Sequence, residues 1–143
     1  MKIEEIQEDK SRGISLKIKE TKHGKGIFAT TGIEEGFLLG FYKGTLREMT
    51  PELKGNDKLL RLRKKPGWYP AGLDFSRYNI VDAREDKNNF LKFINDFRTI
   101  ADRPNVKFLQ DGMFYTCRPI AADEQLLTDY GEKWWETYRK YHQ

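Results

Sequence analysis

The chain has 143 residues, of which 38% are hydrophobic, 13% aromatic and 34% charged, and its formal net charge is +4. This length suits one domain with one core, and the chain lacks an apolar run long enough to span a bilayer. A single cysteine, Cys117, excludes an internal disulfide framework, and with only two histidines the chain is poor in ligands for a structural metal. We therefore expect no metal and interpret Cys117 as a small buried residue rather than a nucleophile.

The first residues are polar and acidic, with no apolar stretch after the first charges. We expect no secretory signal, an intracellular protein and a polar lead-in over residues 1–12. Leu16 and Ile18 alternate with lysines, which predicts a half-buried strand over residues 15–20. A second strand is predicted over residues 24–30. A third, over residues 37–44, is apolar on both faces, which is typical of a central strand.

The middle of the chain, residues 45–76, differs in composition and is interpreted as an insertion. Its pattern predicts a helix over residues 57–65, followed by an irregular loop rich in proline and glycine. The basic run at residues 61–66 is interpreted as the solvated face of this helix. Nucleic-acid binding by this run is the alternative, but no aromatic side chains alternate with its charges, so we do not expect direct binding.

The last part of the chain predicts a strand, two helices and a hairpin. A strand is predicted over residues 77–83, and a short helix within residues 86–96 after an Asp/Asn-rich cap. Residues 105–120 form a hairpin pattern with Asp111-Gly112 as a two-residue turn. Trp134, Tyr138 and Tyr141 lie at i, i+4 and i+7, which predicts an aromatic helix stripe at the C-terminus.

Taken together, these elements predict a mainly β fold with short helices. No β-helix-β alternation appears, which argues against a doubly wound nucleotide-binding fold. The pair Gly24 and Gly26 is not followed by a helix pattern, so a phosphate loop is not expected. We interpret the two glycines as bare backbone that can close on a ligand.

Three segments, in this order, resemble the SET-domain protein lysine methyltransferases: "HGKGIFA" with "GFLLGFYKG", "FINDF…RPNVKF", and "CRPIAADEQLLTDYGEKWW". The second and third look especially like the PR-type branch of that family. The resemblance implies a SET (β-clip) fold of small curved sheets with a C-terminal pseudoknot. It places a SET domain at residues 13–131, with the insertion at about 45–76, and a C-terminal aromatic helix at 132–143.

The same resemblance implies a reaction and a catalytic residue. Family members transfer a methyl group from S-adenosylmethionine to a lysine ε-amine, usually of a histone tail, so a nuclear protein is expected if histones are the substrate. Tyr130 in "LLTDYG" matches the family's catalytic tyrosine, and a core tyrosine at a strand end is the alternative. Tyr42 matches a channel-lining tyrosine, with Tyr115 and Tyr78 as weaker candidates.

The resemblance also implies the residues that hold the cofactor. Backbone groups come from the segment around Lys25, Gly26 and Ile27. Side-chain or neighbouring backbone groups come from Asn95, Asp96 and Trp134. The alternative for Asn95 is a buried amide that satisfies local backbone, and for Trp134 the apolar face of the last helix, with Trp135 as the other candidate over the adenine. At Asp96 the family usually has histidine.

Two further hypotheses remain beside the active enzyme. One is a catalytically weak SET-like module that binds a peptide or a partner without turnover, which the departure at Asp96 favours. The other is the basic nucleic-acid-binding domain considered above. Binding of S-adenosylmethionine separates the active enzyme from the module without turnover. A steep loss of affinity with added salt identifies the nucleic-acid-binding domain.

Overall fold

The computed structural model describes residues 3–9, 14–42, 44–47, 59–61, 80–85, 89–109 and 112–141. The elements in these residues are β1 (Ile3–Asp9), β2 (Ile14–Thr21), β3 (Gly24–Ala29), β4 (Leu38–Phe41), β5 (Thr45–Arg47), β6 (Leu59–Arg61), β7 (Ile80–Asp82), η2 (Leu91–Phe93), β8 (Asn95–Asp96), β9 (Val106–Phe108), β10 (Met113–Thr116), β11 (Leu127–Thr128) and α1 (Glu132–Tyr141). Strands dominate, and the helices are short. The predicted mainly β fold class is confirmed.

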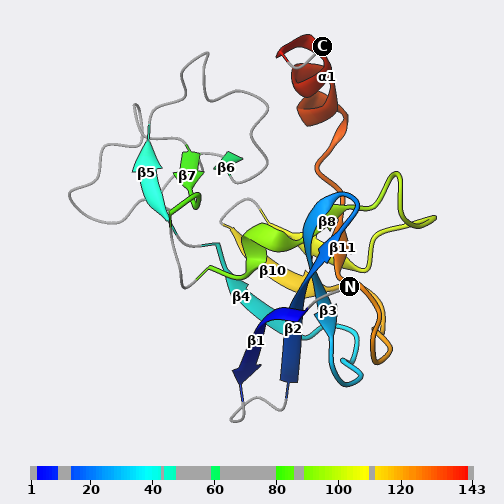
Figure 1. Ribbon diagram of the computed structural model, residues 1–143. Coiled ribbons are helices and arrows are strands. Elements are labelled where there is room, and N and C mark those ends of the chain that lie inside the picture. The colour runs from blue at the N-terminus through cyan, green and yellow to red at the C-terminus, as the bar shows by residue number, and fades with distance from the viewer. Residues whose placement is uncertain are drawn as a thin grey trace.

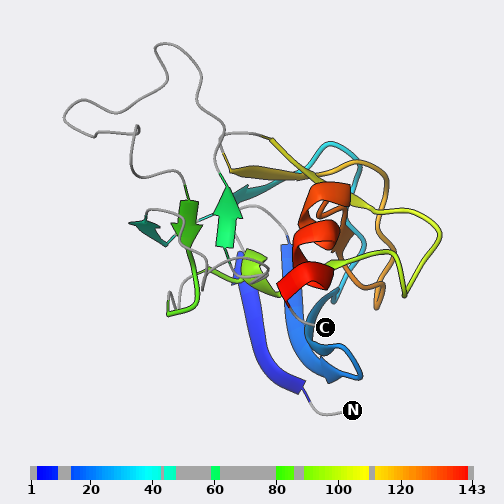
Figure 2. The same ribbon diagram turned by 90° about the horizontal axis from the view of Figure 1, so that it is seen from above.

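The strands form four small sheets, ordered β1-β2-β3, β4-β10-β9, β11-β8 and β5-β7-β6. Figure 1 shows the β5-β7-β6 sheet beside the other three, and α1 at the end of the molecule away from the β1–β2 hairpin. The view from above keeps the same separation between the β5-β7-β6 sheet and α1 (Figure 2). Among the described residues, no helix is long and apolar enough to cross a lipid bilayer.

The core lies where β2 and β3 meet η2 and the β4-β10-β9 sheet. Ile14, Leu16 and Ile18 on β2 are buried, while the residues between them are partly exposed, as the alternating pattern predicted. Residues 26–29 of β3 are all buried, so this strand is covered on both faces. Val106 and Phe114 complete the cluster from β9 and β10.

The predicted hairpin is present. β9 and β10 pair antiparallel, with Phe114 opposite Phe108. The Gly112 N–H donates to the Leu109 carbonyl at 2.9 Å, while Asp111 of the predicted turn pair lies outside the described residues. Gly112 has a φ of 90°, a backbone conformation that favours glycine.

Two other predictions were wrong in the described residues. The segment predicted as a lead-in contains β1, which pairs antiparallel with β2. The helix predicted over 57–65 is contradicted at residues 59–61, which form β6 and pair with β7; the rest of that segment lies outside the described residues. In both cases pairing with a partner strand outweighs the local pattern, because a strand is stabilised by its neighbour rather than by itself.

The short helix predicted within 86–96 is reduced to a single 3-10 turn at Leu91–Phe93. The side chain of Asn89, one residue before the N-cap Phe90, accepts a hydrogen bond from the Lys92 N–H at 3.2 Å. The chain then enters β8, where Asn95 and Asp96 pair with Leu127 and Thr128 of β11 in parallel. This early end of the helix places the polar pair Asn95-Asp96 on a strand.

The C-terminal strand β11 is held on both sides by one loop of the chain. On one side it pairs with β8, and on the other the buried Asn105 exchanges hydrogen bonds with Leu127: its N–H donates to the Leu127 carbonyl at 3.0 Å and its Oδ1 accepts from the Leu127 N–H at 2.8 Å. The Thr128 hydroxyl donates to the Val106 carbonyl at 2.8 Å. Residues 95–106 therefore flank the C-terminal segment, in agreement with the expected pseudoknot.

Candidate active site

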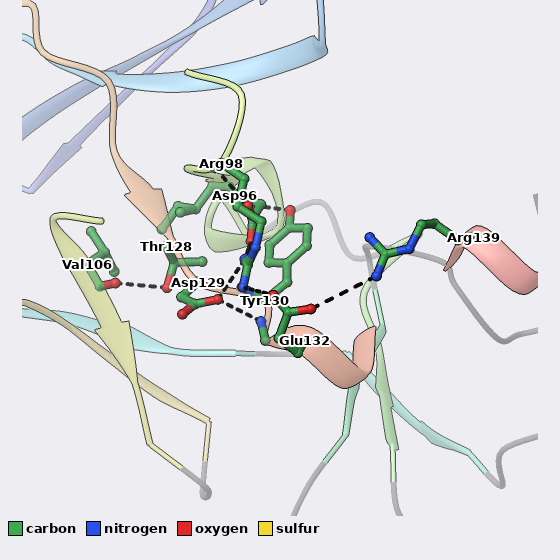
Figure 3. Close-up of polar contacts among 10 residues, drawn as sticks. Asp96, Arg98, Val106, Thr128, Asp129, Tyr130, Glu132 and Arg139 are labelled. Carbon is green, nitrogen blue, oxygen red and sulfur yellow. Dashed lines mark hydrogen bonds and ion pairs between the residues drawn. The ribbon is translucent and has the colours of Figure 1, made fainter. Parts of the chain in front are cut away.

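Tyr130 follows β11 and is fixed at both ends. Its hydroxyl donates to the carbonyl of Ile94 at 2.9 Å, and its backbone N–H donates to Oδ2 of Asp96 at 2.8 Å. Figure 3 shows the Tyr130 ring lying beside Asp96. Because the hydroxyl hydrogen is directed to Ile94, the oxygen presents its lone pairs to its other surroundings.

Asn95 is the neighbouring polar residue and is buried. Its Nδ2 donates to the Lys25 carbonyl and to Oε1 of Gln125, both at 3.2 Å. It thereby ties β3 and the segment before β11 to β8. This geometry agrees with the alternative for Asn95, a buried amide that satisfies local backbone, and equally places an amide donor beside the β3 glycines.

The two β3 glycines have different physical roles. Gly24 has a φ of 89° and open space where a side chain would point, so it is required by its backbone conformation. Gly26 has no such φ, but a Cβ there would lie 2.6 Å from Oε1 of Gln125 and 3.3 Å from Nδ2 of Asn95. Of the pair, Gly26 alone is required because other groups approach the backbone closely.

Lys25 and Ile27, on either side of Gly26, contribute differently. The Ile27 side chain is completely buried in the core, and its carbonyl accepts from the Leu126 N–H at 2.9 Å, so only its main chain faces the site region. Lys25 is exposed, and its Nζ lies 5.6 Å from the centre of the Phe93 ring. A cation above a ring face at this distance gains a modest attraction.

Asp96 departs from the histidine that the family resemblance implied, and the structure gives it a set of partners. Its Oδ1 accepts from the Arg98 N–H at 2.9 Å, and its Oδ2 pairs with the Arg98 guanidinium at 2.7 Å. Burial of Arg98 lowers its pKa, but the hydrogen bond to Asp129 and the charges of three nearby carboxylates outweigh burial and raise the pKa above its usual value. Asp96 is thus a buried, paired carboxylate that holds the Tyr130 backbone.

The C-terminal helix was predicted correctly and brings Trp134 of the predicted aromatic stripe against Tyr130, while the side chain of Tyr141 lies outside what the structure describes. The Trp134 ring meets the Tyr130 ring edge-on, with centroids 4.8 Å apart, and stacks on Tyr138 at 5.3 Å. Trp135 packs against both members of that stack. Its indole Nε1 is buried and has no hydrogen-bond partner among the described residues.

The structure does not bring together Tyr42 and Tyr115, the two channel candidates that it describes. Tyr42 stacks on Phe114 with centroids 5.7 Å apart and packs against the core. Tyr115 follows Phe114 on β10 and points to the opposite face of that strand, so it does not share a surface with Tyr42. Tyr78 lies outside the described residues. Tyr42 stays the stronger candidate.

Two side chains of this region were not among the predicted site residues. Gln125 covers Gly26 and bonds Asn95, but it lies in no periodic pattern that would single it out. Arg98 links Asp96 to the C-terminal segment. A signal for it existed, because Asp-Ala-Arg at 82–84 and Asp-Phe-Arg at 96–98 repeat the same short pattern.

The groups that converge here suit a ligand with a charged amino-acid end and a flat aromatic end. Amide and carbonyl groups lie at Lys25 and Asn95, and the half-buried Trp134 ring lies beyond Tyr130. Such donors and acceptors complement a zwitterion, and an aromatic ring complements a base. Among the residues that the structure describes, no group of three or more His, Cys, Asp or Glu side chains is arranged to hold a metal ion.

Comparisons with known proteins bear on the family and the fold of the chain. The model of the SET domain family matches residues 24–131, which begins later than the predicted start at residue 13 and ends at the predicted residue 131. Among solved structures, the methyltransferase domain of human PR domain-containing protein 2 is similar, with a TM-score of 0.61 and 22% sequence identity. The match covers 82% of this chain and 78% of that chain. At this identity the likeness concerns the fold.

Proposed function

This chain belongs to the SET-domain family, and from that premise we propose that it transfers the methyl group of S-adenosylmethionine to the ε-amine of a lysine in a protein. Histone tails are the substrate class we propose first, with a nuclear location to match. The observation that carries the proposal is the placement of Tyr130: its hydroxyl is fixed next to Asn95 by the Ile94 carbonyl, with Trp134 against its ring.

The reaction sets clear requirements for the protein. S-adenosylmethionine supplies a methyl group on a positively charged sulfur. The lysine nitrogen forms the new C–N bond with its lone pair as the S–C bond breaks, with its electron pair left on sulfur, and one proton leaves the amine. The amine must be neutral to react, although a free lysine has a pKa of about 10.4. The protein must therefore exclude water and align the amine.

Tyr130 meets the alignment requirement. The hydroxyl donates to a backbone carbonyl, so its oxygen acts as an acceptor toward a substrate N–H. Its position is set by packing and by two hydrogen bonds from different segments, which limits its freedom before any ligand binds. A tyrosine held in this way can orient an amine without itself reacting.

Charge around Tyr130 supports a cationic substrate. Asp96, Asp129 and Glu132 lie within reach of one guanidinium, that of Arg98. Asp129 and Glu132 are exposed on the surface next to Tyr130. Glu132 also contacts Arg139 at 3.9 Å, so three carboxylates face two guanidiniums, and the remaining negative charge favours the approach of a lysine side chain and of a basic peptide.

The proposal is tested in two steps. Calorimetry with S-adenosylmethionine measures cofactor binding, and labelled cofactor with a panel of histone peptides measures transfer by mass spectrometry. Tyr130→Phe should lower kcat by roughly 10²-fold or more while cofactor affinity changes little, because the hydroxyl is needed for orientation. Tyr138→Phe, which removes a hydroxyl from the same aromatic cluster, is the matched control. Equal turnover in Tyr130→Phe and wild type would remove Tyr130 from the reaction.

A binding module without turnover is the second candidate, and one observation favours it. The Gln125 amide occupies the space next to Gly26, and both Asn95 Nδ2 bonds are made within the chain. A cofactor must displace or share these contacts. A folded sample that binds a peptide but releases no heat with S-adenosylmethionine would establish this module and reject the enzyme.

A further inference from the structure

Arg98 is the one side chain that joins the β8 region to both sides of Tyr130 in the described structure. Its Nη1 lies 2.7 Å from Oδ2 of Asp96 and 2.7 Å from Oδ1 of Asp129, and its Nη2 lies 3.6 Å from Oε1 of Glu132. Figure 3 shows the guanidinium between these carboxylates, beside the Tyr130 ring. Residues separated by about thirty positions therefore share one cation.

The two carboxylates closest to Arg98 are also the acceptors for the backbone on either side of Tyr130. Oδ2 of Asp96 accepts the Tyr130 N–H at 2.8 Å, and Oδ1 of Asp129 accepts the Gly131 N–H at 2.8 Å. The oxygens that bind Arg98 Nη1 are the same oxygens that bind these amides. The guanidinium thus sets the position of both acceptors, and the acceptors set the position of the tyrosine.

Because the Asp96 carboxylate is buried, its position depends on the positive charge of Arg98. The Asp96 side chain is 4% exposed and that of Arg98 27% exposed, whereas Asp129 is 50% exposed. A buried carboxylate without its partner carries an uncompensated charge, and the surrounding structure then moves or takes up water to solvate it. Without Arg98, the change falls first on Asp96 and on the Tyr130 backbone that it holds.

We propose that Arg98 is a positioning residue for the methyl-transfer reaction: it clamps Asp96 and Asp129 so that the Tyr130 backbone holds the hydroxyl oxygen where it can accept from the lysine amine. The proposal rests on the function proposed above. Arg98 touches no reacting atom in this scheme and acts through the two carboxylates. It also accounts for the aspartate at position 96, because a carboxylate accepts both from the guanidinium and from the Tyr130 amide.

The chain contains a matched control for this clamp. Arg84 folds back on Asp82 in the same way: its backbone N–H donates to Oδ1 at 3.1 Å, and its Nε and Nη2 contact the two carboxylate oxygens at 3.0 and 2.8 Å. Asp82 is as buried as Asp96, with 5% of its side chain exposed. The hydrogen bonds and ion pairs described for this pair do not reach the C-terminal segment.

The experiment compares Arg98→Met, Arg98→Lys and Arg84→Met with wild type. For each, kcat and the KM for cofactor and for peptide are measured separately and corrected for the folded fraction, and amide hydrogen exchange at Tyr130 and Gly131 is followed without ligand. We expect Arg98→Met to lower kcat about tenfold or more, with little change in the KM for S-adenosylmethionine, since a displacement of 1 Å can cost 10²-fold. Exchange at both amides should rise, and Arg98→Lys should recover part of each effect, because an ammonium supplies the charge without the planar fork.

A purely structural role predicts something different. In that case Arg98→Met and Arg84→Met lose similar stability, and kcat per folded molecule is equal in both, which would overturn the proposal. Unchanged exchange at Tyr130 and Gly131 in Arg98→Met would overturn it as well. If wild type transfers no methyl group to any peptide, the proposed function fails, and the exchange measurement alone decides whether Arg98 clamps the Tyr130 backbone.

Discussion

The contact between Gly26 and Gln125 leads to a quantitative prediction about Gly26→Ala. The new Cβ would lie 2.6 Å from Oε1 of Gln125, whereas ordinary contact begins at 3.4 Å, so the oxygen must withdraw by about 0.8 Å. It is the end of a flexible side chain and is able to move. The Asn95 amide, now 3.2 Å from that oxygen, loses its bond in the process.

The size of the effect follows from these terms. Loss of one neutral hydrogen bond costs about 1 kcal/mol. Alanine also lowers the entropy of the unfolded chain relative to glycine, which stabilises the fold by about 0.4–1 kcal/mol where the backbone conformation is compatible, as it is at Gly26. In the wild-type background, the loss of the hydrogen bond and the lower entropy of the unfolded chain therefore have nearly equal and opposite effects on stability. In a Gln125→Ala background the 2.6 Å contact and the hydrogen bond are both absent, while the 3.3 Å approach to Asn95 Nδ2 is the same in both backgrounds, so the stabilising effect dominates.

A double-mutant cycle measures this difference. Urea unfolding, followed by tryptophan fluorescence, is carried out on wild type, Gly26→Ala, Gln125→Ala and the double variant, and we expect a coupling free energy of about 1 kcal/mol. Gly24→Ala is the control: its φ of 89° strains alanine by about 1–2 kcal/mol, but without coupling to Gln125, because nothing lies near its Cβ position. Additivity of Gly26→Ala and Gln125→Ala within about 0.3 kcal/mol would refute the contact as the reason for glycine at position 26.

Two further predictions concern the fold. Asn105→Ala should destabilise the protein by about 3 kcal/mol in urea unfolding. The fully buried amide bonds the Gln125 carbonyl at 2.9 Å and the Leu127 N–H at 2.8 Å, and the substitution would leave both groups unsatisfied. A loss of stability below about 1 kcal/mol would contradict the role of Asn105 in holding β11. The hydrogen bond from Lys17 and the charge of that lysine lower the pKa of Asp123. A lowered carboxyl pKa contributes stability that is present above the ordinary value of about 3.9 and lost as the pH falls through the folded pKa. The stability difference between wild type and Lys17→Met should therefore shrink below about pH 4, and added salt should reduce it at pH 7; a difference that is constant with pH would show that the pair does not contribute.

Local pattern was enough to predict much of the fold and part of the site. The alternation in β2 states which of its side chains are buried, and the aromatic spacing of α1 predicts that Trp134 and Tyr138 share one face, because each pattern depends only on the period of its own element. The motif resemblance placed Tyr130, Asn95, Gly26 and Trp134 in one site, and the structure links them through successive contacts from β3 to α1.

Long-range pairing decided the rest. β1 and β6 have weak local patterns and exist because β2 and β7 supply hydrogen-bond partners, so no window of the sequence predicts them. The separation of Tyr42 from Tyr115 depends on which face of β10 each side chain meets, and a shift of one residue in register would reverse it.

The sequence by itself determined the element types with strong periodicity, the family and the residues that carry its motifs, because these are properties of consecutive residues. The tertiary structure alone decided that Gln125 fills the space beside Gly26 and that Arg98 joins Asp96 to Asp129. Such contacts form between side chains about thirty to a hundred positions apart, and their geometry is set by the crossing of β8, β11 and β3 rather than by any local preference.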